Sequence, residues 1–216
     1  MQVEIWSDVI CPWCYIGKHR FEQALAGFEH AGQVQVRYRS FELDESFPAG
    51  RAEPVAQVLA ARYRMTAGQA AEAEAAMAAR AAADGLAYTA DRAVGRTFDA
   101  HRLVHLAAEQ DLAGPLVNSL YAAYFGSGQP VFAAADLTRV AAGTGLDPAR
   151  TEQVLAGPEY GEAVRADEAQ ARELGISGVP FVVIGRRYGV SGAQPVEVFT
   201  RALETAWQQD GEQAAG

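Results

Sequence analysis

The fold is decided by the stretch Ser7-Asp8-Val9-Ile10-Cys11-Pro12-Trp13-Cys14-Tyr15. It follows an apolar run at 3–6 that predicts a short strand, and it opens a segment with apolar side chains at helical spacing. Cys11 therefore lies at the N-terminal edge of a helix. Pro12 takes the first helical position, where the missing N–H costs no hydrogen bond. Cys14 follows one turn later on the same face, close enough to Cys11 for a disulfide.

This placement predicts a reactive cysteine. The unpaired N–H groups and the positive dipole end of the helix favour a thiolate at Cys11. Cys14 then stands beside it to resolve the product of attack. The chain has only these two cysteines, and a Cys-x-x-Cys pair in a reducing compartment indicates a redox or metal site rather than a structural disulfide.

The composition narrows the class of protein. The 216 residues are half hydrophobic and about a fifth charged, which predicts one large globular domain, or one domain with an insertion. A net charge of −9 argues against a nucleic-acid partner and against an anionic membrane surface. No basic and apolar leader opens the sequence and no apolar run reaches membrane-spanning length, so we expect a cytoplasmic protein without a membrane partner.

The order of predicted elements is that of a thioredoxin fold interrupted once. Alternation over 33–39 predicts a second strand after a helix ended by Gly32, which gives a β-α-β unit. Alanine-rich helical patterns then fill the chain to 175, with capping signals at Thr66 and Asp147 and a last helix over 158–174. Strands return over 175–184 and 187–190, and a helix over 195–207 closes the fold.

We therefore predict an α/β protein with a large all-helical insertion. Residues 1–45 and 158–216 form the two parts of a thioredoxin-like domain, and residues 46–157 form the insertion.

Several motifs together resemble the DsbA family of thioredoxin-fold proteins. These are the Cys11-Pro12-Trp13-Cys14 pair after a strand, Gly178-Val179-Pro180 before a strand, and the long helical insertion between them. Three further stretches resemble the FrnE-like branch, which is related to 2-hydroxychromene-2-carboxylate isomerases and kappa-class glutathione transferases. They are Phe98-Asp99-Ala100-His101-Arg102-Leu103, Ala166-Asp167-Glu168-Ala169 and Tyr188-Gly189-Val190-Ser191-Gly192-Ala193-Gln194-Pro195.

The resemblance implies roles for the site residues. Cys11 is the nucleophile, Cys14 resolves the mixed disulfide, and Pro180 follows a cis peptide bond beside the pair. Pro12, Trp13, Val179 and Pro180 are then the substrate-binding residues, with the Val179 backbone pairing with an extended substrate. The isomerase and kappa branch typically has serine where Cys11 stands, and relatives often have asparagine where this chain has Arg96.

Other interpretations of these residues remain open. His101 and His105 are four apart on a predicted helix and would complete a Cys₂His₂ zinc set with the cysteine pair, although the spacing favours no metal. Lys18, His19 and Arg20 fit a solvated helix face better than a role in stabilising a thiolate. Asp8 is a weak candidate for a proton acceptor near Cys14.

The predicted function is that of a thiol–disulfide oxidoreductase acting on protein or small-molecule disulfides or dithiols. It needs no organic cofactor because the electrons reside on the two sulfurs, and glutathione is left open as a co-substrate. The alternatives are a glutathione-dependent isomerase or transferase, and a binding module or holdase without redox chemistry. The sequence carries no prediction of oligomeric state.

Overall fold

The protein is described by a computed structural model, which gives the backbone of residues 1–214 and the side chains of residues 1–209. The chain forms two compact units. The first combines Met1–Phe41 with the described residues from Ala166 onwards, and the second is Glu42–Arg165. The boundaries predicted from the sequence fall after residues 45 and 157. The second differs because helix α8 (Gly161–Glu173) runs across the boundary instead of lying wholly on one side of it.

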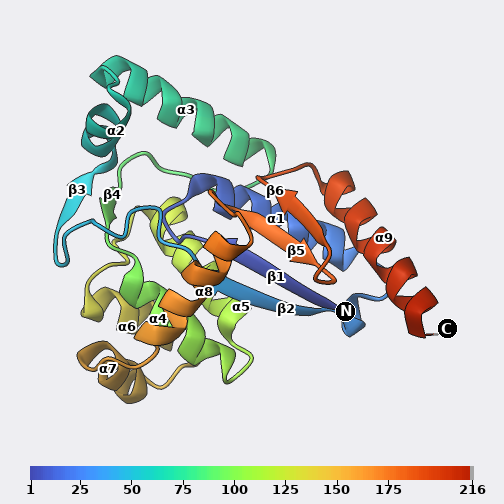
Figure 1. The fold of residues 1–216 in the computed structure, drawn as a ribbon. Helices are drawn as coiled ribbons and strands as arrows, with labels where there is room; N and C mark the ends of the chain where they lie inside the picture. Colours follow the sequence, from blue (N-terminus) through green and yellow to red (C-terminus); the bar gives the residue numbers. More distant parts are fainter. Residues whose placement is uncertain (215–216) are drawn as a thin grey trace. The chain divides into compact units, whose positions relative to one another are not determined.

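A four-stranded sheet in the order β2-β1-β5-β6 forms the centre of the first unit (Figure 1). Its strands are β1 (Gln2–Ser7), β2 (Gln35–Ser40), β5 (Phe181–Ile184) and β6 (Tyr188–Ser191). β1 pairs with β2 in parallel through the crossover helix α1 (Pro12–Ala26), as the predicted β-α-β unit requires. β1 and β5 are antiparallel, as are β5 and β6, and helix α9 (Val196–Ala214) follows.

Apolar side chains cover both faces of this sheet. On one face, Ile5 packs with Phe21 of α1 and Phe199 of α9, whose rings meet edge to face at 5.8 Å between centroids. On the other face, Trp6 packs with Ala171 of α8 and with Ile176. The two central strands, β1 and β5, are therefore largely buried, and α1 begins in the segment that follows β1.

A buried ionic cluster joins β1, β2 and α8 in the first unit. The Arg39 guanidinium hydrogen-bonds the Glu4 carboxylate and donates to Asp167 Oδ1 at 2.7 Å. Asp167 Oδ2 accepts the Ser40 backbone N–H at 2.9 Å, and the Asp167 carbonyl accepts the Trp6 indole N–H at 3.1 Å. The Asp167 motif singled out in the sequence thus ties a helix to two strands.

Helix α1 ends earlier than predicted. Its last residue is Ala26, and the N–H of Gly27 closes the final turn on the carbonyl of Gln23 at 3.2 Å. The expected end at Gly32 is wrong, because a short 3₁₀ turn (Ala31–Gln33) occupies that position and β2 starts only at Gln35. Gly27 and Gly32 are close together in the sequence, and the prediction took Gly32 as the end of the helix where the structure has Gly27.

The second unit is mainly helical. Its helices are α2 (Val55–Tyr63), α3 (Ala67–Ala83), α4 (Phe98–Ala108), α5 (Ala113–Tyr121) with a π-helical continuation over Ala122–Gly126, α6 (Ala134–Ala142) and α7 (Pro148–Ala156). The predicted caps are confirmed, since Thr66 and Gln69 form a reciprocal capping box and Asp147 Oδ1 accepts the Ala149 N–H at 3.1 Å.

Two short strands depart from the expected all-helical insertion. β3 (Ala52–Pro54) and β4 (Ala93–Gly95) pair antiparallel within the second unit. Three residues carry too little alternation to be predicted as strands from sequence. Across the described residues, we find no helix that combines the length and the hydrophobicity of a membrane span.

Candidate active site

The two cysteines lie at the start of α1, directly beyond the end of β1. Cys11 is the residue before the helix, with an extended backbone (φ −84°, ψ 113°), and Pro12 is the first helical residue. The Cys11 carbonyl accepts the Cys14 N–H at 3.0 Å, and the Cys11 N–H donates to the Asp8 carbonyl at 3.2 Å. This is the helix-edge placement that the sequence predicts.

Exposure distinguishes the residues of the Cys-x-x-Cys stretch. Cys14 is completely enclosed, Cys11 keeps 4% of its surface, and the intervening Trp13 keeps 41%. Both cysteines are free thiols in this structure. Trp13 is one of few large apolar side chains exposed among the described residues, and it stands beside a nearly buried thiol.

The environment of Cys14 holds it in the thiol form. Burial raises the pKa of the Cys14 thiol well above its usual value, and a hydrogen bond and an electrostatic interaction with Cys11 raise it further. A backbone hydrogen bond at Asp8 opposes this rise, while the Asp8 carboxylate adds to it. The hydrogen bond also means that the two sulfurs are neighbours, as a redox pair requires.

The loop before β5 supplies the other side of the site. The Cys11 thiol donates to the Val179 carbonyl oxygen, with 3.6 Å between sulfur and oxygen. The Val179–Pro180 peptide bond is cis, and the Pro180 carbonyl accepts the Gly192 N–H at 2.8 Å. Cys11 and Val179 are thus brought together from opposite ends of the chain, as expected from the sequence.

Gly17 is a site residue that sequence reasoning missed. A Cβ atom built on Gly17 would lie 2.9 Å from Pro180 Cγ and 3.2 Å from Ala193 Cα. Helix α1 therefore approaches the Pro180 loop so closely that no side chain fits between them. A glycine inside a helix, where it costs about 1 kcal/mol relative to alanine, was the available signal.

Lys18 does not lie on a solvated face, so that interpretation is wrong for this residue. Its side chain is 3% exposed, lies 5.5 Å from the centre of the Tyr38 ring and pairs with Glu22. Burial lowers the pKa of Lys18, and the Glu22 carboxylate opposes the change. Lys18 thus lies near the Tyr38 ring of β2, and its long apolar stem can be buried while its ammonium group pairs with Glu22.

Asp8 is buried beside the pair. Its relative exposure is 0%, and its interactions with Cys14 are those given above. His101 is also buried, on α4, and His105 is partly buried on the same helix. In the described part of the chain, no three or more His, Cys, Asp and Glu side chains gather in a way that would hold a metal ion.

Comparison with known families now identifies the chain. The model of the DSBA-like thioredoxin domain matches residues 2–204, which is nearly the whole sequence. The chain belongs to the DSBA-like thioredoxin family. This DSBA-like protein has the fold described above, and its family supports an enzyme of the general oxidoreductase or isomerase kind.

Individual relatives agree with this assignment. The chain is similar to a probable DsbA oxidoreductase from Streptomyces coelicolor, with 50% identity, a TM-score of 0.92, and coverage of 96% of this chain and 90% of that one. It is 26% identical to the protein YwbO of Bacillus subtilis, over 94% of this chain and 96% of the relative. A 2-hydroxychromene-2-carboxylate isomerase shares the fold at 15% identity, with a TM-score of 0.70 and 99% coverage of both chains.

Proposed function

We propose that this DSBA-like protein is a thiol–disulfide oxidoreductase in which Cys11 is the nucleophile and Cys14 the resolving thiol. The observation that carries the proposal is the hydrogen-bonded pair of thiols, one at the start of a helix and the other fully enclosed one turn inside it. A helix start favours a thiolate on the first cysteine, while burial keeps the second protonated until the mixed disulfide has formed.

The reaction balances without any further group. The Cys11 thiolate attacks one sulfur of a substrate disulfide, so that the substrate S–S bond breaks and its other sulfur leaves as a thiolate that takes up a proton. Cys14 loses its proton and attacks the Cys11 sulfur, which forms the Cys11–Cys14 disulfide and releases the second substrate thiol. Two electrons pass from the pair to the substrate, and the reverse sequence oxidises a dithiol.

Substrate contacts follow from what lies around Cys11. The exposed Trp13 offers an apolar surface next to the thiol, and Pro12 continues it. The Val179 backbone, whose carbonyl already accepts from Cys11, would pair with an extended substrate, with Pro180 beside it. The substrates are therefore disulfides or dithiols of proteins or small molecules, and glutathione is suited to serve as a co-substrate.

We place the protein in the FrnE-like branch and in the cytoplasm. Support for the branch comes from the motifs at 98–103, 166–169 and 188–195. Support for the compartment comes from the cysteine content, since both cysteines of the chain serve the redox pair and none is left for structural disulfides. Cell fractionation with an antibody to the native protein tests the location.

Trapping of the mixed disulfide tests the proposal directly. A Cys14→Ser variant incubated with a chromogenic aromatic disulfide should accumulate one covalent adduct on Cys11, measured by mass spectrometry, because attack persists and resolution is lost. The matched Cys11→Ser variant should form none. A Cys14→Ser variant that forms no adduct would contradict the proposal. Glutathione affinity together with turnover of a chromene-type substrate would then favour the isomerase, and substrate binding that is unchanged in Cys11→Ser would favour a binding module.

A further inference from the structure

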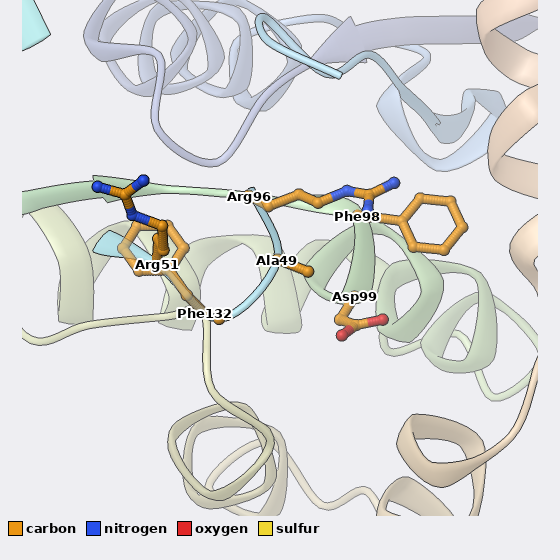
Figure 2. A pocket seen from close by; sticks show the side chains of 7 residues that line it. Ala49, Arg51, Arg96, Phe98, Asp99 and Phe132 are labelled. Carbon is orange, nitrogen blue, oxygen red and sulfur yellow. The ribbon is translucent and has the colours of Figure 1, made fainter. Parts of the chain in front are cut away.

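A small pocket in the second unit has no part in the thiol chemistry proposed above. It has a volume of about 160 Å³ and lies between the loop before β3 and the junction of β4 and α4. The pocket is lined by the side chains of two arginines, two phenylalanines and one aspartate, namely Arg51, Arg96, Phe98, Phe132 and Asp99. Figure 2 shows Arg51 and Phe132 on one side of Ala49, and Arg96 and Phe98 on the other.

The aromatic walls of the pocket are fixed by close packing. A Cβ atom on Gly95 would lie 2.7 Å from the Phe132 ring, so this ring rests directly on the backbone of β4. The Tyr124 ring meets Phe132 edge to face at 5.9 Å. Phe98 is held between guanidinium groups, with Arg165 at 4.6 Å and Arg96 at 5.1 Å from its ring centre. The pocket is therefore formed before any ligand arrives.

A third guanidinium, that of Arg102, lies 5.9 Å from the centre of the Phe98 ring. Arg96 differs from Arg102 and Arg165 in its hydrogen bonds. Arg165 donates to Glu42 at 2.9 Å, and Arg102 donates to Asp99 and to backbone carbonyls. Among the described residues, Arg96 has only a 3.7 Å ion-pair contact from its Nε to Glu42, too long for a hydrogen bond. A guanidinium carries five N–H donors, so Arg96 keeps donors for a ligand at the wall of a pocket.

The charges that line the pocket favour an anion. Asp99 is already neutralised by Arg102, with 2.7 Å between Oδ1 and Nη1. Arg51 pairs with Glu53 at 3.2 Å, and both side chains are exposed, so water and salt screen that pair. The buried Glu42 near Arg96 is shared with Arg165. The side chains that line the pocket, Arg51, Arg96 and Asp99, therefore carry one positive charge more than negative, although the whole chain carries a net charge of −9.

We propose that this pocket binds a small organic anion whose carboxylate pairs with Arg96 and whose flat apolar body lies against the Phe132 ring. A guanidinium matches a carboxylate with two parallel hydrogen bonds, which an amide of the same shape cannot accept in the same way. The volume suffices for one ring, since a cavity of ~150 Å³ lined by apolar side chains holds a benzene molecule. Arg51 adds positive charge at the mouth.

Titration of the full-length, isotope-labelled protein with sodium benzoate tests this site by nuclear magnetic resonance. Benzoate should shift the resonances of Arg96 and Phe132, and benzamide, its neutral isostere, should bind at least tenfold more weakly. Arg96→Gln should weaken benzoate binding at least tenfold, and Arg51→Gln at least threefold. The matched control Arg139→Gln, an exposed arginine of α6 outside the pocket, should bind benzoate within twofold of the wild type.

Three results would overturn the proposal. Equal affinity for benzoate and benzamide would mean that charge plays no part. Unchanged benzoate binding in Arg96→Gln would show that Arg96 does not pair with the carboxylate. If that variant does not fold, unchanged binding in Arg51→Gln would overturn the proposal equally. Arg51 is exposed, so its replacement leaves the core intact. Inorganic phosphate that shifts the same resonances as strongly as benzoate would contradict the aromatic part of the site.

Discussion

Replacement of Gly17 by alanine should separate activity from stability in this protein. The added Cβ enters a gap between α1 and the two segments that flank the site, at 2.9 Å from Pro180 Cγ and 3.2 Å from Ala193 Cα. Neighbouring carbons prefer separations of about 3.5–4.0 Å, so the Pro180 loop must move by roughly 0.6–1 Å. That movement carries Val179 with it and disturbs the 3.6 Å contact between the Val179 carbonyl and Cys11.

Two effects of the added methyl group oppose one another in the free energy of unfolding, whereas the reaction rate is affected only by the displacement of the loop. Overpacking costs about 1–3 kcal/mol, whereas alanine in place of glycine inside a helix gains about 1 kcal/mol, which leaves a net loss of about 0–2 kcal/mol. A displacement near 1 Å at a reacting group lowers the rate by up to about 100-fold. We therefore expect Gly17→Ala to fold with nearly native stability and to attack disulfides about 10–100-fold more slowly.

The assay is the rate of adduct formation with the chromogenic disulfide, measured next to urea unfolding of the same samples. Gly27→Ala, at the residue that caps the C-terminal end of α1, is the control, because its Cβ would meet nothing closer than 3.8 Å and its φ is −85°. This control should keep the native rate. A Gly17→Ala variant that reacts as fast as the wild type would refute the argument that α1 positions the Val179 loop.

Further predictions concern stability. Because the pKa of Cys14 is raised in the folded protein, the unfolded chain loses the Cys14 proton at a lower pH than the folded protein does. The reduced protein therefore keeps its full stability below the unfolded pKa of ~8.5 and loses up to ~1.4 kcal/mol per pH unit above it. Urea unfolding at pH 8 and 9.5 should show this loss, and Cys14→Ala should lack it. Arg39→Leu should cost about 3–5 kcal/mol by leaving the buried carboxylates of Glu4 and Asp167 without their cation, and an unchanged urea midpoint would contradict this. Thr66→Ala removes a helix cap, and thermal unfolding should register a loss of about 0.5–2 kcal/mol.

Local signals in the sequence were sufficient wherever neighbours along the chain decide the structure. The placement of Cys11 and Pro12 at a helix start follows from their own backbone preferences, and the capping box at Thr66 closes within four residues. Helix α2 lies within the stretch predicted to be helical but was not predicted as a separate helix, because Val55–Tyr63 has no capping side chain and its N-cap residue is Pro54.

Contacts between distant segments were beyond such signals. Nothing near Gly17 in sequence indicates that Pro180 will lie against it, and the burial of Lys18 depends on Tyr38 of a neighbouring strand. Arg96 entered the sequence analysis only as a departure from a family pattern. Its surplus of hydrogen-bond donors is visible only once Phe98, Glu42 and the pocket around them are in place.

The interruption of the first unit affects how this unit folds while the chain is being synthesised on the ribosome. β1 lies between β2 and β5, but β5 follows only after the whole of the second unit has been translated. At ~5–20 residues per second, translation from the end of β2 to the start of β5 takes roughly 7–28 s, and during this time one edge of β1 stays unpaired. During that interval Cys11 also lacks the Val179 carbonyl, so the nascent chain carries this thiol before the loop that accepts its hydrogen bond exists.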